Sequence, residues 1–274
     1  MDAKGISMAR FRKIRRRLFP GFPSGTDVKQ MRARALRRIG LSRCRVPKLL
    51  VDQPDLLYGS ILPMAIAEHV IQTGHLTFLQ IGAFDGNQND DLKHVLNRFP
   101  VKGVLVEPQP NVYRRLQALH GDNRDLTLVN AAIDKVCGVR PFYMLEGGDL
   151  ECASFDRNHL IKHGVAPKQI YSQEVPCKTV HQVLEDAGLD SVDLLQIDAE
   201  GYDYEIIKTI DFERLTPAML RFEYRHLSSA DIDECLEMLS SHGYRFIVEE
   251  LDLIAIHTNA VATHEEVIGR NRAA

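Results

Sequence analysis

Beyond about residue 55, short apolar runs alternate with segments whose apolar residues recur at helical spacing. Runs of this kind are typical of strands buried on both faces, and a helix is the usual connection between two parallel strands. The expected strands are residues 77–81, 103–106, 126–131, 192–197, 218–224, 245–249 and 253–257, and the expected helices are 60–73, 90–99, 111–119, 180–187, 204–210 and 231–242. The alternation predicts an α/β fold, a doubly wound and mostly parallel sheet with helices on both faces.

The N-terminal segment has a very different charge from the rest of the chain. Residues 1–48 carry 15 lysines and arginines against two aspartates, a net charge of +13, whereas the remainder has 19 basic and 35 acidic residues and a net charge of −16. We therefore expect two parts, a basic helical extension over residues 1–54 and a catalytic domain over 55–274. The extension suits an arm docked on an acidic body, an anionic membrane surface or, with less support from the sequence, nucleic acid.

The overall composition predicts an ordinary globular protein. A chain of 274 residues fits one large domain with an extension, and no apolar run reaches the roughly 20 residues that span a bilayer. No apolar segment of the kind found in secretory signals follows the first residues. The five cysteines are scattered and odd in number, so we expect a reducing cytoplasm, with peripheral membrane contact through the basic extension as an alternative.

The first motif that points to chemistry follows the strand at 77–81. Gly82 and Gly86 enclose Ala-Phe-Asp85 in a turn that leads towards a helix. Glycines at such a turn let the backbone approach a nucleotide-like ligand, although a tight turn alone would also explain them.

A second motif, Glu107-Pro108, ends the next strand 25 residues after Gly82. An acid at this place in a doubly wound sheet can accept hydrogen bonds from both hydroxyls of a ribose. A nicotinamide site fits less well, because Phe84 stands where the dinucleotide fingerprint needs glycine. Adenosine without a pyrophosphate fits better, which points to S-adenosylmethionine, and we assign Pro108 to the same site.

The strand at 126–131 ends in Asn130 and Ala131. The amide of Asn130 is a candidate contact to the cofactor, and the small side chain of Ala131 leaves room for a flat ring. An ordinary strand end is the alternative.

Acidic residues are concentrated after the last two parallel strands. If extended geometry persists past residue 197, Asp198 and Glu200 share one side of the strand, and Glu223 at the end of the next strand lies beside them. Ligands of open α/β sheets bind at this edge. Helix capping, or salt bridges with Arg221 and Arg225, would be the structural explanation.

Together these segments resemble the FkbM family of methyltransferases. The resemblance rests on Gly82-Ala-Phe-Asp-Gly86, Val106-Glu-Pro108, Asn130-Ala-Ala132, Asp193-Leu-Leu-Gln-Ile-Asp-Ala-Glu-Gly201 and Phe222-Glu-Tyr-Arg-His226. It covers roughly residues 75–258. The resemblance implies a class I methyltransferase fold, which is Rossmann-like, and O-methylation of a sugar, a polyketide or a related small molecule or glycan.

The resemblance also implies roles for individual residues. Gly82, Asp85 and Gly86 would line the methionine end of S-adenosylmethionine and Glu107 would hold the ribose. Asn130 and Asp198 would lie near the reacting centre. The family often has lysine where this chain has Gln196, so substrate class and metal requirement do not transfer with it.

We expect in-line transfer of the sulfonium methyl group to a substrate oxygen. Asp198 and His226 are the candidate general bases, while Glu200 and Glu223, with Asp198, are candidate ligands of substrate or of Mg²⁺. The irregular residues 139–178, with strands expected at 139–145 and near 174–178, should cover the site and select the acceptor through Ser154, Asp156, Arg157, His159 or Tyr171.

Two other functions stay open at this point, a nicotinamide-dependent oxidoreductase and a membrane-associated scaffold with a degenerate methyltransferase site. The sequence leaves the oligomeric state open.

Overall fold

The structure is a computed structural model of the chain, and it describes residues 42–43, 50–51, 61–87, 90, 92–145, 153–249 and 251–260. Contacts divide the chain into two units, Met1–Gly59 and Ser60–Ala274. In the first, the strands β1 (Ser42–Arg43) and β2 (Leu50–Val51) pair antiparallel. The predicted basic helix within residues 1–41 lies outside the described residues, and the division at 54–55 stays a prediction.

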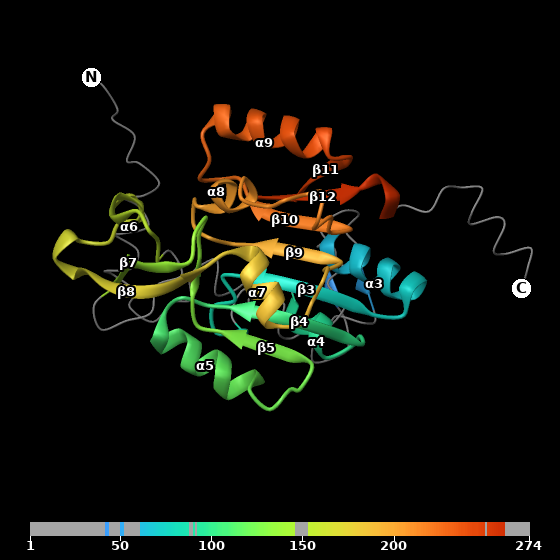
Figure 1. The fold of residues 1–274 in the computed structure, drawn as a ribbon, viewed down its shortest axis with the longest axis horizontal. Coiled ribbons are helices and arrows are strands. Elements are labelled where there is room, and N and C mark those ends of the chain that lie inside the picture. Colours follow the sequence, from blue (N-terminus) through green and yellow to red (C-terminus); the bar gives the residue numbers. More distant parts are fainter. Residues whose placement is uncertain are drawn as a thin grey trace, which may run out of the picture. The chain divides into compact units, whose positions relative to one another are not determined.

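The second unit is built on a seven-stranded sheet with the order β11-β12-β10-β9-β3-β4-β5 (Figure 1). Neighbouring strands from β10 to β5 run parallel, whereas β12 is antiparallel to both β10 and β11. Their bounds are β3 Leu76–Ile81, β4 Val101–Val106, β5 Leu126–Val129, β9 Leu194–Ile197, β10 Met219–Glu223, β11 Tyr244–Glu249 and β12 Asp252–His257. The predicted mostly parallel sheet is confirmed.

Helices cover both faces of this sheet. Alternate residues of β3 belong to different cores, since Phe78 packs in one cluster and Leu79 in the other. The cluster around Phe78 contains residues of α3, α4 and α5, and the cluster around Leu79 contains residues of α7, α8 and α9. The helix bounds are α3 Ile61–Thr73, α4 Leu92–Leu96, α5 Pro110–His120, α7 Val180–Asp186, α8 Asp203–Ile207 and α9 Ser229–Ser241. The sheet is therefore doubly wound, as the strand and helix pattern predicts.

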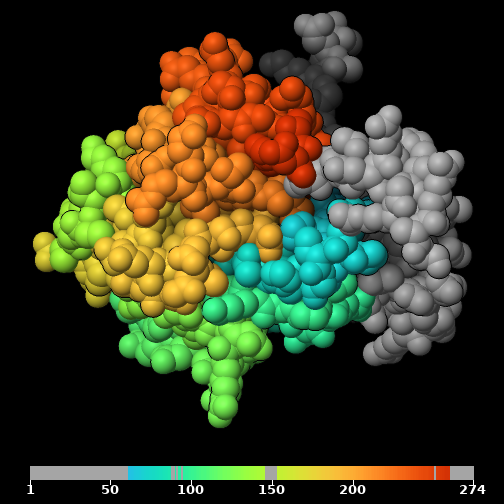
Figure 2. Space-filling model, turned by 45° about the vertical axis from the view of Figure 1, so that its right-hand side comes forward, coloured from blue at the N-terminus to red at the C-terminus, as the bar shows by residue number. Residues whose placement is uncertain are grey.

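The helix α3 also covers the antiparallel edge of the sheet. Residues of α3 share a core cluster with Ile254 of β12, and the backbone N–H of Ile61 donates to the carboxylate of Glu249 in β11. In Figure 2, α3 (cyan) lies next to the red surface of the last strands. None of the helices in the described part of the chain is long and apolar enough to cross a membrane.

A three-stranded sheet is inserted between β5 and α7. Its order is β6-β8-β7, with β6 Ala132–Ile133, β7 Gly138–Leu145 and β8 Ile170–Lys178, and the helix α6 (Arg157–Lys162) lies between β7 and β8. It has a small core of its own, which includes Phe142, Met144 and Val175. Figure 1 shows this insertion beyond the ends of the central strands, on the left.

The structure differs from the sequence prediction mainly in the insertion. The segment before residue 174 was expected to be irregular, yet residues 170–173 already pair with β7. β6 and α6 are too short to give a periodic pattern. Among the predicted helices, α4 is shorter than residues 90–99.

Candidate functional site

The strands at the centre of the sheet end in register. Ile81 pairs with both Val106 and Ile197, so Gly82, Glu107 and Asp198 leave the sheet side by side. β3 is also the switch point, because the chain winds from β3 to β4 and β5 on one side and continues to β9 and β10 on the other. A crevice at the carboxyl ends of the strands is expected at such a point, and it is the usual ligand site of open α/β sheets.

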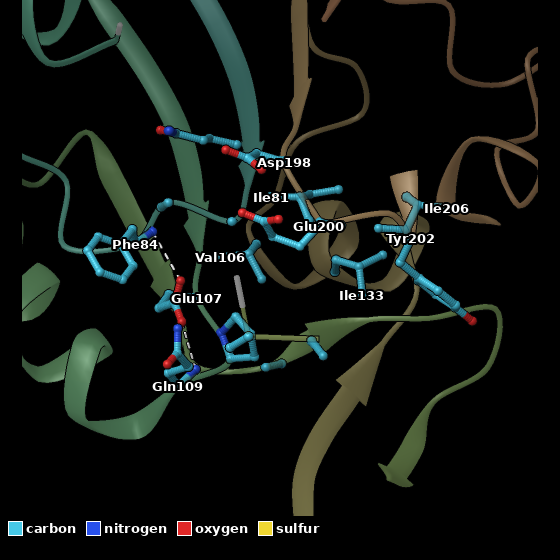
Figure 3. A pocket seen from close by; sticks show the side chains of 18 of the residues that line it. Ile81, Phe84, Val106, Glu107, Gln109, Ile133, Asp198, Glu200, Tyr202 and Ile206 are labelled. Atoms are coloured by element: carbon cyan, nitrogen blue, oxygen red, sulfur yellow. Dashed lines mark hydrogen bonds between the residues drawn. The ribbon is translucent and has the colours of Figure 1, made fainter. Parts of the chain in front are cut away.

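A cavity of about 190 Å³ lies at this place (Figure 3). The turn after β3, the ends of β4 and β9, and the inserted sheet all contribute to its wall. The lining residues are Gln80, Ile81, Gly82, Ala83, Phe84, Asp90, Val106, Glu107, Pro108, Gln109, Ala131, Ala132, Ile133, Phe142, Ala153, Phe155, Gln196, Asp198, Ala199, Glu200, Tyr202 and Ile206.

Both predicted glycines have left-handed backbone conformations for reasons of packing. Gly82 has a φ of +80°, and a Cβ there would lie 1.9 Å from the backbone oxygen of Asp198. Gly86 has a φ of +68°, and a Cβ there would meet side chains of Leu116 and His120 at 2.8 Å. Gly82 lines the cavity, while Gly86 is not among the lining residues. The two glycines therefore allow the turn to pack closely against the end of β9 and against α5.

Glu107 lies in the cavity wall and holds the turn in place. Its Oε2 accepts a hydrogen bond from the backbone N–H of Phe84 at 3.0 Å, and its Oε1 accepts one from that of Gln109 at 2.7 Å (Figure 3). Burial raises the pKa of Glu107 to about 7, although these donors and the positive charge of Arg115 oppose the shift. The Gln109 side chain is a third donor to Glu107, and because a carboxylate has about four acceptor positions, it can still accept from a ligand hydroxyl.

Two other residues that were predicted to bind the cofactor hydrogen-bond to the backbone and do not line the cavity. Asp85 Oδ1 accepts a hydrogen bond from the N–H of Asn87 at 3.0 Å. Asn130 Nδ2 donates to the backbone oxygens of Glu107 at 2.8 Å and Pro108 at 3.2 Å. Neither is among the described residues that line the cavity, whereas Pro108 and Ala131 are.

Two glutamines supply polar atoms to the cavity. Gln80 and Gln196 are on the adjacent strands β3 and β9, where they pair in register. Gln80 Nε2 donates to Asp90 Oδ1 at 3.2 Å. The Oε1 atoms of both glutamines are buried and meet no donor within the part of the chain that the structure describes. Buried acceptors of this kind favour a ligand that carries hydrogen-bond donors.

Asp198 and Glu200 both line the cavity, but not through continued strand geometry. β9 ends at Ile197, and Glu200 has a φ of +50°, so the predicted extended alternation stops before it. The exposed surface of Asp198 borders the cavity, and the protein packed around the rest of the side chain desolvates it. This desolvation raises the pKa of Asp198 to about 7, and the negative charges of Glu200 and Asp252 add to it.

A buried acid that the sequence did not mark, Asp203, holds the two strand ends together. Asp203 is fully buried. Its carboxylate accepts hydrogen bonds from the backbone N–H of Gly201 at 3.2 Å and of Glu223 at 3.3 Å. Burial, with the charge of Asp198, raises its pKa well above the ordinary range. Asp203 therefore positions the turn that carries Glu200.

Glu223 and His226 lie beside Glu200 and are not among the lining residues. The His226 Nε2 atom is 3.2 Å from Glu223 Oε2 and 3.6 Å from Glu200 Oε2. Burial raises the pKa of Glu223 to about 7 and lowers that of His226. Arg221, considered above as a partner of these acids, donates to Asp252 at 2.7 Å.

The inserted sheet adds an aromatic wall that the sequence did not reveal. Phe142, Phe155 and Tyr202 line the cavity and pack edge to face, with centroids 5.1 Å apart. Arg140 lies over the Phe155 ring at 4.2 Å and donates to Asp134 at 2.6 Å. The tyrosine hydroxyl also donates to Asp134, so this wall is fixed to the central domain.

Of the residues proposed to select the acceptor, His159 and Ser154 contact Glu200. His159 Nε2 lies 3.0 Å from its Oε2, and the Ser154 hydroxyl donates to its backbone oxygen at 3.4 Å. The others have local contacts. Asp156 caps α6, Arg157 donates to the Pro167 backbone oxygen, and the Tyr171 hydroxyl contacts Met144 Sδ.

The sheet order, the antiparallel β12 and the cavity at the switch point together define the class I methyltransferase fold. The profile described as the methyltransferase FkbM domain matches residues 80–246, more than half of the chain, and the chain belongs to this family. The domain is therefore a methyltransferase domain, and its fold is not that of the nicotinamide-dependent alternative. No curated protein sequence matches the chain.

Several solved structures match the chain at low identity and with TM-scores below 0.5. One is a methyltransferase FkbM from Methylobacillus flagellatus KT, 12% identical, with 67% of this chain covered and a TM-score of 0.44. This chain spans 44% of that protein. Others are a precorrin-6y C5,15-methyltransferase from Geobacter metallireducens GS-15 (13% identity, 79% and 91% coverage, TM-score 0.38) and a human methyltransferase 10 domain containing protein (14%, 85% and 97%, 0.39).

Proposed function

We propose that this chain uses S-adenosylmethionine to methylate a hydroxyl group of a small molecule or glycan. The observation that carries the proposal is the position of Glu107. This acid follows the second strand of a methyltransferase sheet, lies in the wall of the switch-point cavity, and has both carboxylate oxygens oriented by backbone donors.

The cavity wall suits the parts of S-adenosylmethionine. Glu107 would accept hydrogen bonds from the two ribose hydroxyls, and Pro108 and Ala131 would lie beside the adenine. The Oε1 atoms of Gln80 and Gln196, which meet no donor in the described part of the chain, would accept from the ammonium group of the methionine moiety. When bound, S-adenosylmethionine supplies an electrophilic methyl group.

The chain itself would position the acceptor and take its proton. Asp198 directly follows the central strand β9 and lies in the cavity wall, so we assign it as the general base that receives the proton of the acceptor hydroxyl. The aromatic wall of Phe142, Phe155 and Tyr202 would pack on an apolar face of a sugar or polyketide acceptor and exclude water.

Magnesium is not part of this proposal. Mg²⁺ prefers oxygen ligands in octahedral geometry. The groups next to Glu200 and Glu223 are imidazole nitrogens, at 3.0 Å from Glu200 and 3.2 Å from Glu223, so the donor set around these acids does not fit Mg²⁺.

Isothermal titration with S-adenosylmethionine, S-adenosylhomocysteine and NAD tests the proposal. We expect both adenosyl compounds to bind with one site per chain and NAD to show no saturable binding. Tighter binding of NAD would overturn the cofactor assignment. If none of the three compounds binds, a scaffold with a degenerate methyltransferase site would explain the chain better.

A further inference from the structure

Three histidines gather next to Glu200, at the border of the cavity. We call His159, His163, His226 and Glu200 the imidazole cluster. The ring centroids lie 4.4 Å apart for His159 and His163, 4.7 Å for His159 and His226, and 4.9 Å for His163 and His226. One potential ligand atom from each of the four residues lies within 4.8 Å of the other three.

The local structure brings these residues together from three segments. His159 is in α6 and His163 is its C-cap residue, so the two imidazoles lie one helical turn apart and stack. His226 follows β10, and Glu200 follows β9. A Cβ at Gly201 would lie 3.3 Å from the Cβ of His226 and 3.5 Å from His159 Nδ1, so a side chain at this position would crowd the cluster.

Two of the distances between donor atoms are close to those between ligands around one metal ion. Ligands about 2.0–2.1 Å from a tetrahedral ion are roughly 3.3 Å apart from one another. Glu200 Oε2 is 3.0 Å from His159 Nε2 and 3.6 Å from His226 Nε2. Two histidines four residues apart on a helix, with further ligands from elsewhere, is an arrangement that zinc proteins use.

The chemistry of the donors narrows the choice of metal. Imidazole suits Zn²⁺, Cu²⁺, Fe²⁺ and Ni²⁺, whereas sets of carboxylate and water oxygens suit Mg²⁺ and Ca²⁺. A set of three imidazoles and one carboxylate belongs to the first class. The side chains of His159 and Glu200 are 10% and 17% exposed, and His163 is exposed, so an ion can enter from solvent at His163.

We propose that His159, His163, His226 and Glu200 bind one divalent transition-metal ion of the imidazole-preferring class. Glu223, whose Oε2 lies 3.2 Å from His226 Nε2, would orient that ring. This assignment rests on the geometry of the cluster and gives His226 the role of a ligand instead of a general base.

The metal would act on the acceptor, and this step rests on the proposed function. Because Glu200 also lines the cavity, the ion would lie at the acceptor side, where it can take the hydroxyl oxygen as a fifth ligand. A bound cation lowers the pKa of such a hydroxyl. The proton then passes to Asp198, the oxygen forms a bond to the methyl carbon, and the bond from that carbon to sulfur breaks.

Metal titration of the purified full-length chain, with Zn²⁺ by calorimetry and Co²⁺ by visible absorption, tests the site without any turnover. We expect one equivalent of either ion per chain. His163→Ala and His226→Ala should each weaken binding at least about 100-fold, because each removes one ligand of a small set. His75→Ala is the matched control, since His75 is an exposed histidine outside the cluster. Melting temperatures of all variants show that each one folds.

The wild-type chain showing no saturable Co²⁺ or Zn²⁺ binding would overturn the proposal. So would unchanged affinity in either cluster variant, because both residues are assigned as ligands. Titration of metal-depleted protein with S-adenosylmethionine separates this result from the proposed function. If the chain binds the cofactor but no metal, the proposed function stands and the metal site is wrong. If it binds the metal but no cofactor, the metal site stands and the proposed function is wrong.

Discussion

The two ends of strand β9 carry aspartates in opposite electrostatic situations. Asp193 directly precedes the strand, and its Oδ2 accepts hydrogen bonds from the N–H and the hydroxyl of Thr77, both at 2.7 Å. Its Oδ1 lies 3.2 Å from His69 Nε2. Burial alone would raise the pKa of Asp193, but His69 and Thr77 outweigh it and lower the value to about 2.

Asp198 directly follows the same strand and has a pKa raised to about 7 by desolvation and by nearby acids. A carboxylate whose partners are built into the fold stabilises the folded state. A carboxylate that the fold desolvates without pairing costs stability, and such residues concentrate at functional sites. We therefore assign a structural role to Asp193 at the amino end of β9 and a role in the reaction to Asp198 at its carboxyl end.

The largest expected effect is that of Asp198→Asn on turnover. The substitution keeps the shape of the side chain and removes its capacity to take a proton. Methyl transfer should fall at least about 100-fold, as for loss of a general base, while binding of S-adenosylmethionine changes little. Single-turnover rates with a labelled methyl group measure the loss. Asp193→Asn serves as the control, and turnover of Asp198→Asn at the wild-type rate would remove Asp198 from the reaction.

The same change at the other end of the strand, Asp193→Asn, should affect stability instead. A pKa of about 2 against an ordinary 3.8 corresponds to about 2 kcal/mol of folding free energy. Because the folded-state pKa is the lower one, this contribution is complete above pH 4 and is lost as the pH falls towards 2. Urea unfolding at pH 7 and at pH 3 measures it. A stability loss that does not shrink at the lower pH would contradict the assignment.

A smaller effect is expected from the pH dependence of cofactor binding. Glu107, with a pKa of about 7, must be ionised to accept both ribose hydroxyls. Affinity for S-adenosylmethionine should therefore fall as the pH drops below 7, by up to about tenfold per unit, with proton release on binding. Calorimetry at pH 6, 7 and 8 in two buffers counts the protons. The dependence should vanish in Glu107→Ala and persist in Asp198→Asn, and the opposite result would assign it to Asp198.

The smallest expected effect on the site is that of removing residues 1–48. These residues carry a net charge of +13 and precede all the residues of the cavity wall, so the remaining chain should fold and bind cofactor as before. Full-length protein should bind anionic vesicles and release them as salt rises, if the segment contacts membranes. Vesicle binding by the truncated chain at the full-length level would assign that contact elsewhere.

The ends of the strands were predicted well from the sequence because the buried strands are apolar and the residues that follow them are not. The runs that end at Ile81, Val106 and Ile197 are mostly apolar, and a glycine or an acid follows each. The order in which such strands wind is restricted, so the switch point and its crevice follow. The sequence did not show how each side chain near that crevice is used, and Asp85 and Asn130 hydrogen-bond to backbone instead of lining the cavity.

Contacts between segments that are distant in the sequence could not be predicted from the spacing of apolar residues. His163 joins Glu200 and His226 only through the packing of the insertion against the central sheet, and no local period marks such a meeting. The spacing of His159 and His163 was the one available signal. Glu200 was placed on the correct side for the wrong reason, because a left-handed turn, not an extended strand, directs it to the cavity.

Calorimetric titration of wild-type, Glu107→Ala and Asp193→Asn protein with S-adenosylmethionine tests the central claim most directly. The claim is that the carboxyl edge of the sheet is a cofactor site organised by Glu107. Wild-type protein and Asp193→Asn should bind alike, and Glu107→Ala should bind more weakly by about 2–3 kcal/mol, as expected when a charged acceptor loses its hydroxyl partners. Wild-type affinity in a folded Glu107→Ala variant would contradict the claim.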